Sequence, residues 1–459
     1  MISHIKQIFE NQAVFFKEEA SMTLSFRLSA LTKLEEAILK YRDEIHQALK
    51  KDLGKSSFEA YITETGFVLH ELKFVKQNLK KWMREQNVPS PQKLVFYSKS
   101  SIKPTPRGQV LIIAPWNYPF QLLVSPLIGA IAAGNTIVLK PSENAANTAS
   151  LIEKIIGETF PSKYISVING DAEISKALLE FDWDLIFFTG STQVGKEIAK
   201  AAAQHLTPVV LELGGKCPVI VHSDANINVA ARRIVWGKII NAGQTCVAPD
   251  YILAHKSVKE KLLKQMIKVL QSMLGKHVKE SGAYGRIINN RHFRRLTALL
   301  ASTNIVHGGE NDERTLFIAP TIVDNVQPSH PLMQDEIFGP ILPVLEYETI
   351  EDAIRFVNRY TPPLAIYQFT GSNKQFDLVA RHTQSGALLK NDTIIHLSNL
   401  HLPFGGVRQS GMGNYHGKYS FEAFSNNRSM LKHATFFDPS LRYPPYTEKK
   451  WKLISKLLQ

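Results

Sequence analysis

The residue with the greatest potential for covalent chemistry is Cys246, in the segment Asn241-Ala-Gly-Gln-Thr-Cys-Val-Ala-Pro-Asp250. The glycine and proline around it predict a turn or the start of a new helix. Backbone N–H groups at such a place lower the pKa of a thiol and bind an oxyanion. A free cysteine is also often an inert buried side chain. The local sequence therefore leaves both a catalytic and a structural role open.

Glu212 is a candidate for acid–base chemistry. It stands in an apolar strand directly before a glycine pair, in the segment Leu211-Glu-Leu-Gly-Gly-Lys216. Burial raises the pKa of a carboxyl group, and a general base is adjusted to work near neutral pH in this way. A glutamate at the end of a strand could equally pair with an arginine. Cys217 follows directly and runs into the next apolar strand, so we expect it to be structural.

Asn117 is a candidate donor to an oxyanion. It follows a predicted strand and lies between Pro115 and Pro119, which restrict the backbone around it. A rigidly held side-chain amide is well suited to stabilise a negative oxygen. Asparagine is also a common turn residue, so the segment by itself allows a structural reading as well.

Two further loops have the composition of a nucleotide site. The segment Lys140-Pro-Ser-Glu143 offers a cation and a carboxylate after one strand, where a ribose could bind. The segment Gly190-Ser-Thr-Gln-Val-Gly195 follows another strand and opens a helix. Small residues there let a pyrophosphate approach the backbone N–H groups. The sequence has no Gly-x-Gly-x-x-Gly fingerprint, so the standard dinucleotide motif is absent.

These loops belong to an alternation of apolar strands and helical patterns. The predicted strands are Val110–Ala114, Thr136–Lys140, Tyr164–Ile168, Leu185–Thr189, Pro208–Leu213 and Pro218–His222. Unbroken apolar strands separated by helices are typical of a parallel sheet covered on both faces, and ligands bind beyond the carboxyl ends of its strands. A second alternation runs from about residue 214 to 395. We therefore predict an α/β protein with two doubly wound domains.

The ends of the chain differ from this pattern. Residues 2–86 have apolar positions at helical spacing and are predicted to form long amphipathic helices. Prolines bracket Leu94-Val-Phe-Tyr97 and Ser98-Lys-Ser-Ser-Ile102, which indicates a small extended β arm or hairpin. The tail, residues 448–459, is basic and could form an amphipathic helix that touches a membrane surface or packs on its own protein.

Composition places the chain among folded soluble proteins. Its 459 residues, 44% hydrophobic and 21% charged, allow two or three domains with a large core. Charged residues interrupt the first segment, so it does not resemble a signal peptide. With two cysteines and no disulfide framework, we expect a reducing cytoplasm. The net charge of +13 is spread along the chain, so we expect a solvated basic surface and no nucleic-acid partner.

Taken together and in order, these segments resemble the aldehyde dehydrogenase superfamily over about residues 100–430. The resemblance is carried by six motifs, among them LELGGK, GQTC, EIFGP and PFGG. The segments Ser-Gly-Met-Gly-Asn-Tyr-His-Gly-Lys418 and Arg442-Tyr-Pro-Pro-Tyr446 are most similar to the class 3 and fatty aldehyde dehydrogenase branch. That branch is typically dimeric and often accepts NAD or NADP.

The resemblance implies a role for each motif. Cys246 would be the nucleophile, Glu212 the base that activates the hydrolytic water, and Asn117 the oxyanion donor together with the backbone N–H of Cys246. No metal is expected. The residues that would bind NAD or NADP are Trp116, Lys140, Ser142, Glu143, Gly190, Ser191, Gly195, Leu213, Glu336 and Phe338. Among them, Lys140 and Glu143 would face the adenosine ribose, and Glu336 would hold the nicotinamide ribose.

The resemblance also implies a domain organisation. A Rossmann-like cofactor domain would comprise residues 1–87 and 104–208, and a catalytic domain residues 209–395. An oligomerisation arm would comprise residues 88–103 and 396–435, followed by a tail at 436–459. The implied reaction is thiolate addition to an aldehyde, hydride transfer, and attack of water on the thioester. Medium or long-chain aliphatic and aromatic aldehydes are the expected substrates.

Two other functions remain as alternatives. In a CoA-acylating dehydrogenase, CoA and not water would take the acyl group, but such relatives tend to lack a glutamate equivalent to Glu212. A catalytically silent binding or structural protein could be built on the same scaffold. Such a protein would be free to lose Cys246, Glu212 or Asn117, and this sequence retains all three.

Overall fold

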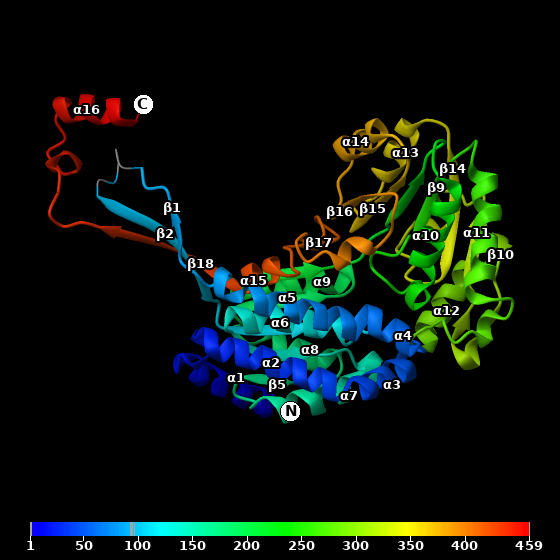
Figure 1. Ribbon diagram of the computed structural model, residues 1–459, viewed down its shortest axis with the longest axis horizontal. Helices are drawn as coiled ribbons and strands as arrows, with labels where there is room; N and C mark the ends of the chain where they lie inside the picture. The colour runs from blue at the N-terminus through cyan, green and yellow to red at the C-terminus, as the bar shows by residue number, and fades with distance from the viewer. Residues whose placement is uncertain (1, 92–94, 96, 459) are drawn as a thin grey trace.

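The computed structural model describes residues 2–91, 95 and 97–458 of the chain. Figure 1 shows two large bodies, each built around its own sheet, and a slender arm that extends away from them and ends in the C-terminal helix. This arrangement confirms the predicted α/β class with two large sheets and a small β arm.

Residues 2–82 are mostly helical, as the spacing of their apolar residues predicts. The elements are α1 (Ile2–Lys17), α2 (Leu24–Lys40), α3 (Arg42–Leu53), α4 (Ser57–Ala60), η2 (Tyr61–Thr65) and α5 (Gly66–Trp82). The η2 segment is a π-helical turn inserted between α4 and α5. Single π turns inside helices occur frequently at functional sites, because the extra residue redirects the side chains around it.

The first large sheet has six strands in the order β17-β7-β6-β3-β4-β5. Its strands are β3 (Gln109–Ile113), β4 (Thr136–Lys140), β5 (Ile165–Val167), β6 (Leu185–Thr189), β7 (Val209–Glu212) and β17 (Gly411–Met412). All pair in parallel except β17, which runs antiparallel to β7. The carboxyl ends of the parallel strands therefore meet at one edge, where the candidate loops begin.

Both faces of this sheet are buried, which explains why its strands are continuously apolar. Along β3, Ile112 packs into a core with α2, α5 and α6, whereas Leu111 packs into a second core with α1, α8 and α9. The helices that follow β3, β4, β5 and β6 are α6 (Gln121–Ala133), α7 (Ala146–Thr159), α8 (Ala172–Leu179) and α9 (Thr192–Gln204).

The second large sheet has seven strands in the order β10-β13-β14-β9-β8-β15-β16. Its strands are β8 (Pro218–Val221), β9 (Tyr251–His255), β10 (Asn304–His307), β13 (Thr321–Asp324), β14 (Ile341–Tyr347), β15 (Ala365–Phe369) and β16 (Ala387–Lys390). Only the β10–β13 pair is antiparallel. The helices that accompany it are α10 (Ile227–Ile239), α11 (Lys259–Leu274), α12 (Asn290–Leu299), α13 (Ile350–Val357) and α14 (Asn373–His382).

The sheet pairing of two strands, β7 and β17, differs from the predicted organisation. Strand β7 pairs with β6, so the first sheet extends to Glu212 and does not end before residue 209. Strand β8 lies in the second sheet and within the segment 209–395 that was assigned to the catalytic domain. Strand β17 belongs to the first sheet and not to the arm, where residues 396–435 were expected. In each case the pairing is decided by distant partners and not by the local pattern.

The arm is a three-stranded antiparallel sheet of β1 (Gln86–Val88), β2 (Ser98–Pro106) and β18 (Ser425–His433). Strands β2 and β18 pair over nine residues, so the arm joins two segments far apart in the sequence. The extended segment predicted at Leu94–Tyr97 lies largely outside the described residues.

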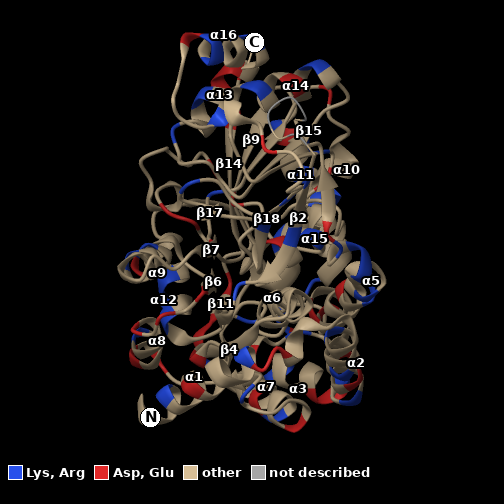
Figure 2. Ribbon diagram, turned by 90° about the vertical axis from the view of Figure 1, so that its left-hand side faces the viewer, with Lys and Arg blue, Asp and Glu red and all other residues tan. Residues whose placement is uncertain are grey.

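The tail ends in α16 (Glu448–Leu458), a helix with no buried residue among those described. Packing on the body of its own chain, one of the two predicted alternatives, is therefore not observed (Figure 1). No helix in the described part of the chain is both long and apolar enough to span a bilayer. Lys and Arg are distributed over both large bodies with Asp and Glu between them (Figure 2).

Candidate active site

Cys246 lies in a turn that follows α10 and the short 3-10 helix η4 (Ile240–Gly243). Asn241, Ala242 and Gly243 all have left-handed backbone angles, with φ between 50° and 73°, and they turn the chain out of the helix. Gly243 is required there, because a Cβ would lie 2.3 Å from the carbonyl oxygen of Gly339. The turn therefore brings Cys246 towards the loop that carries the EIFGP motif.

The environment of Cys246 favours the neutral thiol. Burial raises the pKa of the thiol, and the carboxylates of Glu336 and Glu212 raise it further. The backbone N–H groups of Cys246 and Val247 act in the opposite direction, because they stabilise the thiolate. Cys217 is fully buried in the core, and its thiol donates to the carbonyl of Cys246 at 3.4 Å. These contacts agree with the structural role expected for Cys217.

Glu212 ends β7 and points into the same cavity as Cys246. Its side chain is 2% exposed, and among the described residues neither of its carboxylate oxygens has a hydrogen-bond partner. Burial raises the pKa of this carboxyl well above its ordinary value. No arginine pairs with it within the described chain, so the structural alternative for Glu212 is not observed.

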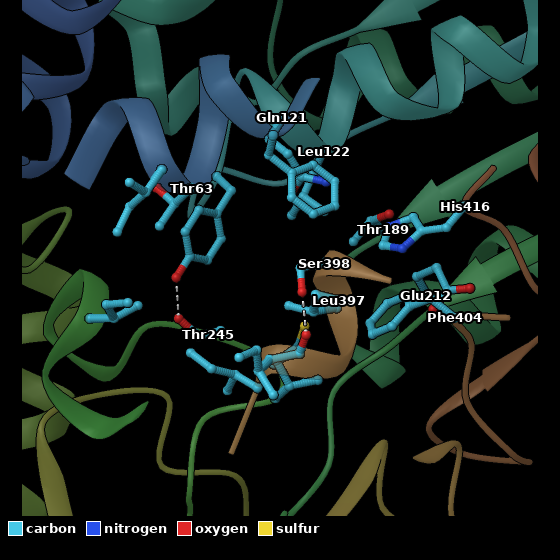
Figure 3. A pocket seen from close by; sticks show the side chains of 18 of the residues that line it. Thr63, Gln121, Leu122, Thr189, Glu212, Thr245, Leu397, Ser398, Phe404 and His416 are labelled. Atoms are coloured by element: carbon cyan, nitrogen blue, oxygen red, sulfur yellow. Dashed lines mark hydrogen bonds between the residues drawn. The ribbon is translucent and has the colours of Figure 1, made fainter. Parts of the chain in front are cut away.

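Two polar groups beside Glu212 were not assigned from the sequence. Figure 3 shows Thr189, Glu212 and His416 on one side of the cavity. The hydroxyl of Thr189 and Nε2 of His416 are also buried without a hydrogen-bond partner in the described residues. Burial lowers the pKa of His416 to about 3, so its ring is neutral. The only signal for His416 was its place in a motif used to recognise the family branch.

Asn117 lies on the other side of the Cys246 turn. Its side-chain Nδ2 donates to the carbonyl of Gln244 at 3.0 Å, two residues before the cysteine. The hydroxyls of Tyr118 and Thr245 form a second link, 2.6 Å long, between the same two loops. The structure therefore brings Asn117 to the Cys246 loop, as its predicted role requires.

Cys246 and Glu212 open on an apolar cavity of about 240 Å³. Its walls include Phe67, Leu122 and Trp236, and Figure 3 shows part of the lining. Ile62 and Ile395 also line it and are 38% and 53% exposed, which places them where the cavity meets solvent. The cavity is suited to a molecule with an apolar body that reaches the buried thiol.

The predicted ribose loop follows β4. Lys140 is 2% exposed, and its Nζ lies 3.7 Å from a carboxylate oxygen of Glu143 and donates to the carbonyl of Pro141 at 2.8 Å. Burial lowers the pKa of Lys140. The hydroxyl of Ser142 accepts from the N–H of Asn144 and caps the short helix that follows. The buried amine of Lys140 and the half-exposed carboxylate of Glu143 offer a donor and an acceptor, which fit the hydroxyl groups of a ribose.

The predicted pyrophosphate loop follows β6 and begins α9. The N–H of Gly190 donates to the carbonyl of Glu212, and the hydroxyl of Ser191 caps the helix at Val194. Gly195 leaves room for the side chain of Leu213, which a Cβ there would approach to 2.6 Å. The open start of this helix fits an anionic ligand.

The EIFGP loop completes this side of the site. Glu336 packs over Gly214, where a Cβ would lie 1.9 Å from its Oε2, so the glycine is required. Burial raises the pKa of Glu336 to about 8. Phe338 has a left-handed φ of 49°, and its ring lies edge-on to Trp116 with centroids 5.3 Å apart. The predicted cofactor residues thus gather at one edge of the first sheet and fit a dinucleotide.

Comparison with known proteins agrees with this geometry. Residues 3–430 match the aldehyde dehydrogenase family. The chain is 48% identical over 447 residues to the 4,4'-diaponeurosporen-aldehyde dehydrogenase of Staphylococcus aureus (strain NCTC 8325 / PS 47), covering 97% of each chain. It is 42% identical over 453 residues to the dimeric NADP-preferring aldehyde dehydrogenase of Canis lupus familiaris, covering 98% and 99%.

A solved structure of the substrate-bound state of Staphylococcus aureus AldH has the same fold. Its TM-score is 0.97 at 47% identity, and the match covers 99% of each chain. The chain therefore belongs to the aldehyde dehydrogenase family, which confirms the resemblance carried by its motifs. It is an oxidoreductase that oxidises aldehydes to carboxylic acids, and NAD or NADP is the cofactor of the family.

Proposed function

We propose that Cys246 is the nucleophile, that Asn117 is the oxyanion donor and that Glu212 is the base for hydrolysis. The observation that carries this proposal is the unpartnered, buried carboxylate of Glu212 in the cavity that also exposes the Cys246 thiol. A buried polar group without a partner lowers stability, so such a group is most easily explained by a reaction that needs it.

Cys246 has to lose its proton before it attacks an aldehyde, since the thiolate is the nucleophile. The N–H groups of Cys246 and Val247 favour the thiolate, and Asn117 supplies a further N–H to the oxygen that becomes negative. Trp116, Lys140, Ser142, Glu143, Gly190, Ser191, Gly195, Leu213, Glu336 and Phe338 would hold the cofactor. When bound, NAD or NADP would supply the hydride acceptor for the oxidation step at Cys246.

Glu212 then removes a proton from water as the water attacks the thioester. Its raised pKa suits a base that works near neutral pH, and Thr189 and His416 lie beside it with free polar atoms. These groups favour water over CoA as the acyl acceptor. They equally disfavour a silent protein, which would have no need of an unpartnered buried acid.

An aldehyde with an apolar chain is the substrate that the cavity supports best. The walls are mostly aliphatic and aromatic, and the mouth is bordered by exposed Ile62 and Ile395. The name of the Staphylococcus aureus relative refers to 4,4'-diaponeurosporen-aldehyde. We expect medium and long-chain aliphatic or aromatic aldehydes to have a higher kcat/KM than short polar ones.

A chain-length series of aldehydes tests this function, with NAD⁺ and NADP⁺ supplied separately and absorbance of the reduced cofactor as the readout. Products are identified by mass with and without CoA. We expect the free acid in both cases. An acyl-CoA product would establish the CoA-acylating alternative, and no reduced cofactor with any aldehyde would establish the silent one.

The proposed role of Asn117 has its own test. Asn117→Ala should retain cofactor binding and lower the rate of hydride transfer by roughly 10²–10³, the range seen when one oxyanion donor is removed. Cofactor affinity is measured by fluorescence titration, and the rate by stopped flow. An unchanged burst of reduced cofactor would refute the assignment.

We also propose that the enzyme is a cytoplasmic homodimer. The name of the canine relative includes the word dimeric, and the arm of β1, β2 and β18 extends away from the body of its own chain (Figure 1). Sedimentation at micromolar concentration should give twice the 51.6 kDa chain mass. Fractionation of the producing cells should place the activity with the soluble cytoplasmic proteins, and a monomer or an exported enzyme would contradict these assignments.

Helix α16 is proposed to contact an anionic membrane surface. The side chains of Trp451 and Leu453 are 73% and 51% exposed, and lysines flank them in the helix. An amphipathic basic helix binds at the lipid headgroup level and is sensitive to salt. Flotation with vesicles containing phosphatidylglycerol, compared with neutral vesicles and with Trp451→Ser, tests the contact. Equal flotation in all three cases would exclude it.

A further inference from the structure

Charged side chains are buried at the junction of α3, α4 and η2, outside the residues assigned to catalysis. Lys55, Glu59 and Glu64 are 0%, 6% and 0% exposed. They lie more than 50 residues before Asn117 in the sequence. Their hydrogen bonds nevertheless reach the two loops that carry Asn117 and Cys246.

Lys55 binds the Asn117 loop directly. Its Nζ donates to the carbonyl of Asn117 at 3.1 Å and lies 4.0 Å from the centre of the Tyr118 ring. The same ammonium group donates to Oε1 of Glu64 at 2.5 Å. Lys55 is therefore held by a carboxylate on one side and holds the backbone of Asn117 on the other.

Glu64 fixes the residues that follow Asn117. Its Oε2 accepts from the N–H groups of Phe120 and Gln121, at 3.0 Å each, where α6 begins. These are N–H groups that a helix leaves without an internal partner, and a carboxylate also interacts favourably with the helix dipole there. The π turn places Glu64 at this position, five residues after Glu59.

Glu59 is linked to the carbonyl oxygen of Asn117 through Asn241. Its Oε1 accepts from the N–H of Asn241 at 2.7 Å, and the side chain of Asn241 donates to the carbonyl of Asn117 at 2.7 Å. Asn241 also donates to the carbonyl of Gln244 at 3.1 Å, to which Asn117 donates as well. The backbone of Asn117 is thus fixed from two directions.

We propose that Lys55 and Glu64 are positioning residues for the oxyanion donor, acting through the backbone of Asn117. The inference rests on the proposed role of Asn117. An oxyanion donor is effective only when it is held in place before the reaction, and an error of about 1 Å can lower a rate about 100-fold. The Lys55 amine supplies a charged donor at the Asn117 carbonyl, and Glu64 fixes that amine.

Shape alone does not account for this pair. Two charges are expensive to bury, and an apolar pair of equal volume often gives the same or greater stability. An apolar pair would leave the Asn117 carbonyl without its Lys55 donor and the start of α6 without its acceptor. The presence of a charged pair at this place is therefore explained by its hydrogen bonds to the Asn117 carbonyl and to the start of α6, and not by packing.

A double-mutant cycle between Lys55→Met and Asn117→Ala tests the proposal in the full-length enzyme. Methionine keeps the length of the lysine side chain and removes its charge. In the otherwise native enzyme, Lys55→Met should lower the rate of hydride transfer about 10-fold or more while cofactor affinity stays within about 2-fold. In the Asn117→Ala enzyme the same substitution should change the rate by less than about 2-fold, because the donor it positions is gone.

Lys259→Met is the matched control. Lys259 is 7% exposed and pairs with Asp324 at 2.8 Å, on α11 and β13 of the second sheet. It should lower the thermal midpoint and leave the rate of hydride transfer unchanged in both backgrounds. A loss of rate that followed stability alone would appear in this control too.

The outcomes separate the two levels of inference. If Asn117→Ala by itself left the rate unchanged, the proposed role of Asn117 would fail. If Asn117→Ala lowered the rate but Lys55→Met lowered it equally in both backgrounds, only the positioning role would fail. If Lys55→Met did not fold, Glu64→Gln would replace it in the cycle, since it keeps the volume and one acceptor oxygen. Additive losses with Glu64→Gln would equally overturn the proposal.

Discussion

Buried polar and ionisable side chains have hydrogen-bond partners on one side of Cys246 and lack them on the other, within the described residues. On the Asn117 side, Lys55 and Glu64 are paired with each other, with backbone groups and with an aromatic ring. On the cavity side, Glu212 and its neighbours Thr189 and His416 have buried polar atoms without partners in the described chain. The two carboxylates, Glu64 and Glu212, are both essentially inaccessible to solvent.

The difference indicates that one side positions the backbone and that the other takes part in the reaction. Paired buried charges give directional contacts and hold the backbone, so they suit residues that position others. Unpaired buried groups cost stability and keep their hydrogen-bonding capacity for a transient partner, such as a reacting water. Substitutions on each side test this difference.

The largest effect is expected at the thiol between the two regions. Cys246→Ser should lower turnover at least about 10³-fold, because a serine hydroxyl is a much weaker nucleophile at this site. Cofactor binding, measured by fluorescence quenching, should persist. Cys217→Ser is the matched control and should change stability more than turnover, since Cys217 is fully buried away from the cavity. Residual turnover near the native rate in Cys246→Ser would remove the thiol from the mechanism.

The cavity side is tested by Glu212→Gln. Loss of a general base lowers a rate by roughly 10²–10⁴, so steady-state turnover should fall by about 100-fold or more. The first hydride transfer needs no hydrolytic water. A stopped-flow burst of reduced cofactor should therefore survive, and mass spectrometry should detect the acyl group on Cys246. If the burst disappeared together with turnover, Glu212 would act before hydrolysis and the assignment would need revision.

The paired side should respond in stability as well as in the rate of hydride transfer. Glu64→Gln leaves the buried Lys55 without its counter-charge, and such a change costs about 3–5 kcal/mol. Glu212→Gln removes a buried ionisable group that has no partner in the described chain, so its unfolding free energy should be equal to or higher than that of the native enzyme. Denaturant unfolding of the two variants side by side makes this measurement. Equal losses in both would show that the contrast between the two regions has no energetic meaning.

The sequence predicted the strands because their burial on both faces makes them continuously apolar. All six strands expected before residue 222 form, and the candidate loops follow them. Strand β7 joins the first sheet although the predicted boundary lies at residue 209, because β7 and β8 are equally apolar and only three-dimensional pairing separates them. The tail helix α16 could be anticipated from its composition, but its lack of contact with the body could not.

The candidate site was predicted unevenly for a physical reason. Cys246 and Glu212 stand in turns and strand ends whose local sequence suggests chemistry. The contact of Lys55 with Asn117 spans 62 residues, and nothing in the helical pattern around Lys55 distinguishes it from a surface lysine. His416 likewise depends on the loop that returns to β7 near Glu212. Residues that act through such distant contacts become visible only in the folded structure.

The smallest expected effect is on the pH dependence of stability, and it concerns the unpaired side. Burial raises the pKa of Glu212 well above its ordinary value of 4.5, so the carboxyl is protonated in the folded enzyme at a pH where the unfolded chain is already ionised. Raising the pH above about 4.5 then favours the unfolded state, because the folded state binds more protons. Glu336 contributes in the same direction up to its pKa of about 8.

Removing the titrating group should flatten this dependence. We expect the thermal midpoint of the native enzyme to fall between pH 5 and pH 8, and that of Glu212→Gln to fall by about 2–4 °C less. Glu336→Gln should behave similarly. Scanning calorimetry in buffers with small ionisation enthalpy gives the midpoints. Parallel curves for the native enzyme and Glu212→Gln would mean that Glu212 acquires a partner in solution, and the contrast between the two sides of Cys246 would then be lost.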